Sequence, residues 1–267
     1  MNKVNNLISI VVPVYNESES IKLLINEISY VMDSHKLEFE LIIVNDGSVD
    51  NTINVLENLS KKIKQLVVIN LRKNYGQTAA LAAGFDNLKG EIIVTLDGDL
   101  QNDPKDIPKL ISKLNEGYDL ICGWRFQRKD KLLNRRIPSK IANRLIGNVT
   151  GIHLHDYGCS LKAFKREIID DIKLYGELHR FLPVLANIEG AKIKEIKVNH
   201  RSRKYGYSKY GIDRTFRVLM DLLTVWFMNK FLTRPMYVFG FIGIISIISS
   251  FITVSYTHLR AHETLGN

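Results

Sequence analysis

Short apolar runs alternate with helix-forming segments through the first 120 residues, and this alternation constrains the fold more than any other feature. Apolar and β-branched residues fill 7–12, 39–44, 66–70 and 92–96, and each run has the length of one buried strand. Apolar residues at helical spacing separate the runs, as in the helix expected to begin at Ser18 or Glu19. Strands that alternate with helices predict an α/β fold with a Rossmann-like, mainly parallel sheet and helices on both faces.

Acidic residues follow three of the predicted strands: Glu17, Asp46, Asp50, Asp97 and Asp99. In such sheets ligands bind beyond the carboxyl ends of the strands, so we expect these side chains to share one site. Asp97 and Asp99 can converge on a hard cation if Gly98 lets the backbone turn between them. Asp103 and Pro104 then predict a helix start, as N-cap and first residue. The alternative is an acidic turn that binds nothing.

Familiar phosphate-binding motifs are missing from the sequence. It contains neither Gly-x-Gly-x-x-Gly nor Gly-x-x-x-x-Gly-Lys-Ser/Thr, which argues against a dinucleotide site and a P-loop. Carboxylates repel phosphate, so either a divalent cation bridges the two or the acids hold sugar and base hydroxyls. Magnesium commonly takes one or two carboxylates plus substrate phosphates. The pattern therefore fits a nucleoside diphosphate held through a cation at Asp97 and Asp99.

Positive charge is concentrated in two stretches, although the net charge of the whole chain is +9. Residues 122–145 carry eight lysines and arginines against one acid, and residues 200–234 carry eight against two. The remainder is therefore net acidic. Two basic patches on an acidic body indicate an anionic partner, which can be a phosphate, a nucleic acid or a membrane surface.

The C-terminal part predicts attachment to a membrane. Residues 235–254 contain no charge and are long enough to cross a bilayer core of about 30 Å. A buried core helix is the alternative for this stretch. Basic residues before it predict that its N-terminal side is cytoplasmic, and the amphipathic segment 212–234 should lie on the membrane surface. Residues 255–267 are abruptly polar, so we treat them as an anomalous tail, foreign or truncated in origin.

Several motifs, taken in order, resemble the inverting family 2 glycosyltransferases of the GT-A fold. They are VPVYNE at 12–17, VNDGS at 44–48, NYGQ at 74–77, DGD at 97–99, GWR at 123–125, DYGC at 156–159 and the basic stretch 201–210. Within that family the set is similar to the polyprenyl-phosphate glycosyltransferases, which include dolichyl-phosphate mannose synthases and bacterial undecaprenyl-phosphate glucosyltransferases. The resemblance covers residues 7–254.

The resemblance implies a role for each matching residue. The nucleotide would be held by Pro13, Tyr15, Glu17, Asp46 and Asp97. Mg²⁺ or Mn²⁺ would be bound by Asp97 and Asp99, with Gln101 beside them. The acceptor phosphate would be held by Arg125, Arg135 and Ser139. The catalytic set would be Asp99, Asp156 facing the sugar, and Arg203 and Lys209 in a basic loop that closes over both phosphates.

The implied activity is metal-dependent transfer of a hexose from a nucleotide diphosphate sugar, with UDP-glucose favoured, to a polyprenyl phosphate. The catalytic domain, residues 1–211, would act at the cytoplasmic face of the cell membrane. The family includes homo-oligomers, so the resemblance allows a homo-oligomer here. Many relatives have two or more C-terminal spans, whereas this sequence has one apolar run of that length.

Two other functions fit part of the sequence. A family 2 transferase could act on a polysaccharide or another hydroxyl acceptor, but processive synthases usually carry a Gln-x-x-Arg-Trp motif that is missing here. A non-enzymatic protein could bind nucleic acid or membranes through the basic patches. That function leaves the strand-end acids unexplained, and they would repel nucleic acid, so no nucleic-acid partner is expected.

Overall fold

The computed structural model describes residues 7–126, 143–202, 213–231 and 234–265. The chain forms two units, Met1–Leu222 and Leu223–Asn267. The first unit holds the sheet and its covering helices, and the second holds most of the apolar C-terminal region.

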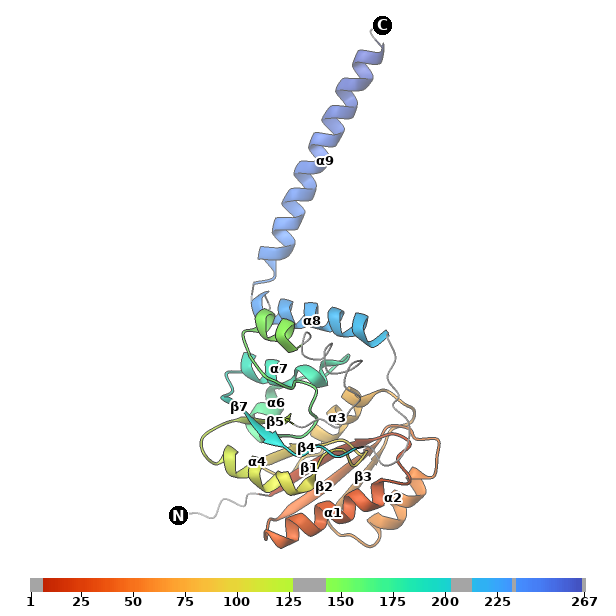
Figure 1. Cartoon of the computed structure of the whole chain (residues 1–267). Coiled ribbons are helices and arrows are strands. Elements are labelled where there is room, and N and C mark those ends of the chain that lie inside the picture. The colour runs from red at the N-terminus through yellow and green to blue at the C-terminus, as the bar shows by residue number, and fades with distance from the viewer. Residues whose placement is uncertain (1–6, 127–142, 203–212, 232–233, 266–267) are drawn as a thin grey trace. The chain divides into compact units, whose positions relative to one another are not determined.

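A seven-stranded mixed sheet forms the centre of the first unit (Figure 1). Its strands are β1 (Ile8–Val14), β2 (Phe39–Asn45), β3 (Leu66–Asn70), β4 (Ile92–Thr95), β5 (Leu120–Arg125), β6 (Lys162–Lys165) and β7 (Ile193–Val198). Their spatial order is β3-β2-β1-β4-β6-β5-β7. Only β6 runs antiparallel to its neighbours, β4 and β5, within this sheet. The predicted mainly parallel α/β sheet is therefore confirmed.

Helices cover both faces of the sheet, as predicted (Figure 1). One face carries α1 (Ile21–Ser34), α2 (Thr52–Ser60) and α4 (Ile107–Leu114), which follows the 3-10 turn η1 (Pro104–Asp106). The other carries α3 (Gln77–Phe85), and the 3-10 turn η2 (Leu178–Phe181) leads into α7 (Leu182–Ile188). The short α6 (Arg166–Asp171) follows β6, and residues 143–150 are also helical.

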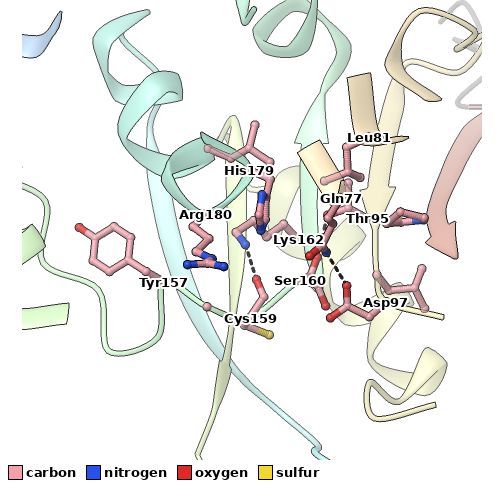
Figure 2. Close-up of a pocket in the computed structure, with 14 residues that line it drawn as sticks. Gln77, Leu81, Thr95, Asp97, Tyr157, Cys159, Ser160, Lys162, His179 and Arg180 are labelled. Carbon is pink, nitrogen blue, oxygen red and sulfur yellow. Dashed lines mark hydrogen bonds between the residues drawn. The ribbon is translucent and has the colours of Figure 1, made fainter. Parts of the chain in front are cut away.

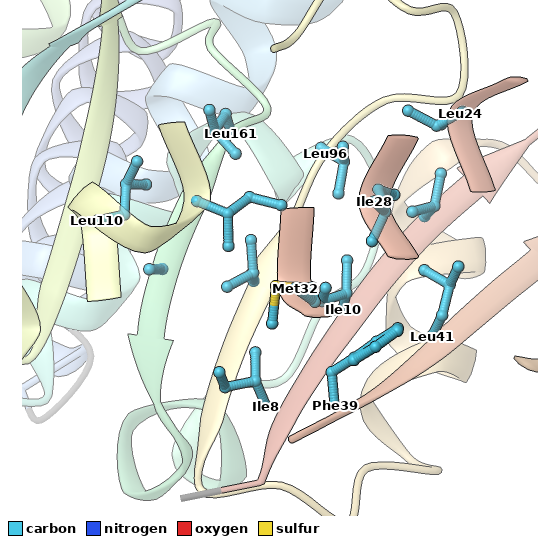
Figure 3. Close-up of a cluster of buried hydrophobic side chains, with 14 of the residues drawn as sticks. Ile8, Ile10, Leu24, Ile28, Met32, Phe39, Leu41, Leu96, Leu110 and Leu161 are labelled. Carbon is cyan, nitrogen blue, oxygen red and sulfur yellow. The ribbon is translucent and has the colours of Figure 1, made fainter. Parts of the chain in front are cut away.

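Alternate residues along the strands build two apolar layers. Ile8 and Ile10 of β1 point into a fully buried cluster with Ile28 and Met32 of α1 (Figure 3). On the opposite face Val11 meets α3, where a Cβ atom at Gly84 would lie only 2.4 Å from Val11 Cγ1. Burial of both faces explains why the strands read as continuous apolar runs.

The helix starts differ in detail from the prediction. The Asp103 side chain caps as expected, accepting a hydrogen bond from Lys105 N at 3.1 Å. The turn that it caps is the 3-10 turn η1, however, and α4 begins only at Ile107. Helix α1 begins at Ile21, after a turn in which the backbone carbonyl of Glu17 accepts from the amides of Ser20 and Ile21.

The C-terminal region consists of two helices, α8 (Asp213–Phe231) and α9 (Met236–Leu265). Within the described part of the chain, α9 is the one helix long and apolar enough to cross a membrane. The candidate span is Met236–Arg260, 25 residues long, and an 18-residue window within it has a mean hydropathy of 2.2. Residues 255–265, expected as a separate tail, continue the same helix.

Candidate active site

The ends of β1, β2 and β4 meet at one edge of the sheet and open into a cleft of about 260 Å³. The structure brings six predicted site residues together in its lining: Pro13, Tyr15, Glu17, Asp46, Asp97 and Asp99. They come from three separate stretches of the chain. The parallel register of the strands is what places them at one edge, as the sequence pattern predicted.

Asp46 builds one wall of the cleft. Its two carboxylate oxygens accept hydrogen bonds from the backbone amides of Tyr75, at 2.7 Å, and Gly76, at 2.9 Å. Gly76 has a φ of 94°, a conformation that L side chains rarely adopt, which explains a glycine at this point of the loop. Asp46 therefore fixes the stretch that leads into α3 and still faces the cleft.

Asp50, the fifth strand-end acid, has a structural role. Its carboxylate accepts hydrogen bonds from the Thr52 hydroxyl at 2.5 Å and from the Ser18 amide at 3.3 Å. The Thr52 hydroxyl in turn accepts one from the Glu17 amide at 2.9 Å. Burial alone would raise the pKa of Asp50, but these hydrogen bonds outweigh it and lower the pKa. Asp50 thus ties the loop after β1 to the loop after β2.

Asp97 is a carboxylate of the cleft with a strongly raised pKa. Burial and then the negative charge of Asp99 raise the pKa of Asp97 to about 6. Hydrogen bonding to Ser160 and the charges of Arg125 and Lys162 oppose this rise only in part. Gln77 Nε2 also donates to Asp97 Oδ1 at 2.8 Å, which orients the carboxylate. Two acids crowded in this way suit a positively charged ligand.

The turn between the two acids differs from the expected one. Gly98 does not adopt a positive φ; Leu100 does, at 62°. A Cβ atom at Gly98 would instead lie 2.7 Å from Val14 Cγ1. Glycine is needed here because the loop packs closely on β1, and the hydrogen bond from the Ser20 hydroxyl to the Gly98 carbonyl, at 3.0 Å, holds it there.

The residues present fit a divalent cation that is shared with a ligand. No group of three or more His, Cys, Asp or Glu side chains is arranged for a metal in the described ranges. Asp97 and Asp99 supply hard oxygen ligands, and burial followed by the charge of Asp99 raises the pKa of Asp97, an effect that a bound cation would offset. Mg²⁺ and Mn²⁺ suit such a pair when phosphates and water complete the coordination.

Arg125 and Asp156 lie outside this cleft and bind each other. Arg125 Nε is 2.6 Å from Asp156 Oδ2, and Arg125 Nη2 is 2.8 Å from Oδ1, a bidentate ion pair that is largely buried. Burial alone would lower the pKa of Arg125, but Asp156 outweighs it and raises the pKa above its ordinary value. Arg125, predicted to bind the acceptor phosphate, and Asp156, predicted to face the sugar, thus form an ion pair with each other. Their catalytic roles stay predictions.

The loop that carries Asp156 is fastened to β7. Glu195 accepts hydrogen bonds from the Asp156 amide at 2.9 Å and from the His155 amide at 3.0 Å. The His155 ring stacks on Trp124, with ring centroids 4.0 Å apart. These contacts fix the position from which Asp156 reaches Arg125.

The basic stretch after β7 starts from a well-anchored residue. Arg201 forms ion pairs with Glu27 of α1 at 2.6 Å and with Asp103 at 2.7 Å. Its amide also donates to the carbonyl of Gln101 at 2.9 Å, which places Gln101 beside the loop after β4. The predicted residues Arg203 and Lys209, and likewise Arg135 and Ser139, lie outside the described residues.

Three cleft residues were missed by sequence reasoning: Glu177, His179 and Arg180. They lie on or next to η2, which the hydrogen bond between the Thr78 hydroxyl and His179 Nδ1, at 2.7 Å, joins to α3. Gln77 was quoted only as part of a motif, without a role. The available signal was a run of polar and charged residues directly before the apolar segment 181–186.

Known proteins share both the sequence and the fold. Residues 9–173 match the family model for glycosyl transferase family 2. The chain belongs to glycosyltransferase family 2. It is 47% identical over 241 residues to the dodecaprenyl-phosphate galacturonate synthase of Rhizobium johnstonii, a match that covers 89% of this chain and 71% of the relative. This similarity confirms the resemblance to the polyprenyl-phosphate glycosyltransferases drawn from the motifs.

Solved structures of similar fold confirm the GT-A-like architecture. The Mycobacterium tuberculosis glucosyl-3-phosphoglycerate synthase in complex with Mn²⁺, uridine diphosphate and phosphoglyceric acid superposes with a TM-score of 0.65 at 20% identity, covering 85% of this chain and 79% of that one. The same enzyme with Mg²⁺ and uridine diphosphate gives 0.65 at 18% identity, covering 85% and 80%. At these identities the likeness concerns the fold alone.

Proposed function

We propose that this family 2 hexosyltransferase moves galacturonate from a nucleoside diphosphate to a polyprenyl phosphate. The observation that carries the proposal is the 47% identity, over 89% of this chain, to a dodecaprenyl-phosphate galacturonate synthase. The acidic cleft at the carboxyl edge of the sheet is consistent with a diphosphate donor bound through a cation. The predicted glucose is not confirmed, and the name of the relative favours galacturonate in its place.

The cleft residues bind and orient the donor in this proposal. Tyr15, Glu17 and Asp46 line the part of the cleft near β1 and β2, where they hold the nucleoside. Asp97 and Asp99 hold the divalent cation. When bound, the cation neutralises the charge that the leaving nucleoside diphosphate gains. Uridine remains the expected base.

A polyprenyl phosphate is already ionised at neutral pH, so the nucleophile needs positioning more than deprotonation. Its oxygen attacks C1 of the sugar, the bond between C1 and the diphosphate oxygen breaks, and the anomeric centre inverts. Arginines suit the acceptor because their planar fork binds phosphate oxygens in pairs. Arg125 has this role only if its ion pair with Asp156 opens or if Asp156 orients it toward the acceptor. Arg135, Ser139, Arg203 and Lys209 keep their predicted phosphate-binding roles.

We also propose that α9 spans the membrane and that the catalytic unit is cytoplasmic. The 25-residue candidate span of α9 is longer than the core of a bilayer, about 30 Å, at 1.5 Å per residue. Lys230 and Arg234 precede it, as the positive-inside rule requires for a cytoplasmic N-terminal side. Residues 1–211 then form the catalytic domain, and α8, which lies within the predicted segment 212–234, is the surface helix. Loss of the protein from carbonate-washed membranes would contradict the span.

The test of function is sugar transfer by membranes that contain the full chain. We would supply radiolabelled UDP-galacturonate, UDP-galactose, UDP-glucose and GDP-mannose together with a polyprenyl phosphate, with Mg²⁺ or with EDTA. Chloroform-extractable label from UDP-galacturonate that EDTA abolishes is the expected result. Label from UDP-glucose alone would overturn the proposed sugar, and donor hydrolysis without labelled lipid would indicate a hydroxyl acceptor instead.

A further inference from the structure

A small side pocket extends from the cleft between β4, β6, α3 and η2 (Figure 2). It shares Pro13, Gln77, Asp97, His179 and Arg180 with the cleft, so the two adjoin at the end where the diphosphate would lie. Its volume is about 50 Å³. Since one water needs roughly 10–15 Å³ by this measure, the side pocket has room for a group of a few atoms, such as a carboxylate.

Lys162 supplies buried positive charge to this side pocket. It is only 3% exposed and stands on β6 in register with Thr95 of β4, two residues before Asp97. Its Nζ donates to the carbonyl of Cys159, and its charge acts on Asp97 across the side pocket, but the described residues place no carboxylate within ion-pair distance of it. Burying an ammonium group away from a close counter-ion is costly. An anionic group in the side pocket would offset that cost.

Arg180 adds a second cation from the opposite element. Figure 2 shows its guanidinium and the Lys162 amine on the same side of the side pocket, with Asp97 and Gln77 across from them. Arg180 Nη2 lies 3.4 Å from Glu177 Oε2, a long contact for an ion pair. The hydrogen bond between His179 and Thr78 holds η2, and therefore Arg180, against α3. A guanidinium on a fixed turn is suited to binding a carboxylate through two hydrogen bonds.

We propose that Lys162 and Arg180 recognise the C6 carboxylate of a hexuronic acid donor and so determine the sugar specificity. The inference rests on the proposed function and deepens it. A neutral hexose presents a hydroxymethyl group at C6, which gains nothing from two cations. A uronic acid presents a carboxylate, which compensates the buried charge of Lys162 and pairs with Arg180. The same pocket then selects the charged sugar over its neutral analogue.

The test compares two donors that differ only at C6. Purified full-length protein in detergent with Mg²⁺ would be assayed for the dissociation constants and kcat/KM of UDP-galacturonate and UDP-galactose. For Lys162→Met and for Arg180→Gln we expect about a ten- to hundredfold loss with UDP-galacturonate, the cost of a lost charge-assisted hydrogen bond, and a change below about threefold with UDP-galactose. Lys165→Met is the matched control, because Lys165 lies on the same strand but pairs with Asp119 away from the pocket.

The outcomes separate this inference from the proposed function. In one outcome the wild-type protein prefers UDP-galacturonate, while the variants lose kcat/KM equally with both donors. That result would overturn only the inference, because Lys162 and Arg180 would then serve the diphosphate or the fold. A wild-type protein with equal dissociation constants and equal kcat/KM for UDP-galactose and UDP-galacturonate would overturn both the inference and the proposed sugar. Should Lys162→Met fail to fold, Arg180→Gln still decides the question, since Arg180 stands at the cleft rather than within the sheet.

Discussion

The two halves of the sheet edge handle their charged residues in opposite ways. On the side of β1, β2 and β4, Asp46 is satisfied by backbone amides, while Asp97 and Asp99 crowd together facing a cleft. On the side of β5 and β7, Arg125 and Asp156 neutralise each other. The side proposed to bind the donor thus crowds two carboxylates at a cleft, whereas the side proposed to bind the acceptor holds an ion pair. Binding on the acceptor side must therefore compete with an existing ion pair.

The largest expected effect comes from removing a carboxylate on the side of β1, β2 and β4. Asp99→Ala should lower turnover about a thousandfold, because a cation ligand is lost. This corresponds to several kcal/mol of transition-state stabilisation. Turnover of the labelled donor at saturating Mg²⁺ measures this. Asp86→Ala, an exposed acid after α3, is the control and should leave turnover unchanged. Near-normal turnover in Asp99→Ala would contradict the metal assignment.

The second effect comes from removing one partner of the ion pair between Arg125 and Asp156. Arg125→Met and Asp156→Leu should each cost about 3–5 kcal/mol of unfolding free energy, because each leaves a buried charge unmatched. The double variant should regain most of that stability, since two apolar side chains replace the pair. Urea unfolding of the three variants measures the coupling. If Arg125 also contacts the acceptor, the double variant keeps a raised KM for polyprenyl phosphate; a normal KM would limit the pair to a structural role.

Ionisation of Asp97 should make the stability of the protein depend on pH. The folded state holds the Asp97 proton with a pKa of about 6, against 3.8 for an unperturbed carboxyl. Its ionisation therefore costs stability as the pH rises from about 4 to about 6, and the cost stays constant above that. Asp97→Asn should gain at most about 3 kcal/mol over the wild type at pH 7, and almost nothing at pH 4. Thermal unfolding in EDTA at both pH values measures it, with Asp33→Asn on α1 as the control.

A smaller effect is expected from the close approach of the loop after β4 to β1. Gly98→Ala should cost about 1–3 kcal/mol of stability, because the new methyl group meets Val14 Cγ1 at 2.7 Å. Val14→Ala makes room, so the double variant should lose less than the sum of the two single variants. Strict additivity would show that the loop, rather than Val14, moves to accommodate the methyl group.

The donor side could be predicted from sequence because its signals are local. Each acid follows an apolar run, and parallel strands bring their carboxyl ends to one edge, so the strand pattern alone groups Glu17, Asp46, Asp97 and Asp99. The acceptor side could not be predicted in this way. Arg125 and Asp156 are 31 residues apart, and their pairing depends on how β5 and the loop before β6 meet.

Residues on η2 were missed for a similar reason. His179 and Arg180 follow no strand end and belong to no phosphate-binding motif. They reach the cleft only because η2 packs on α3, 101 residues earlier in the chain, through Thr78. A tertiary contact of that range leaves no periodicity in the sequence. The 3-10 turn at Pro104 and the role of Gly98 as a packing residue also depend on tertiary contacts.

The single antiparallel strand has an evolutionary consequence. Because β6 enters the sheet against the direction of β4, its first residue, Lys162, stands beside Thr95 at the ligand edge. The stretch that lines the far wall of the side pocket is therefore encoded separately from the stretches that line the nucleotide cleft. If the side pocket selects the sugar as proposed, substitutions between residues 158 and 162 would change which sugar is accepted while the nucleotide-binding segments are inherited unaltered. Related enzymes could then acquire different donor sugars through a few substitutions directly before and at the start of β6.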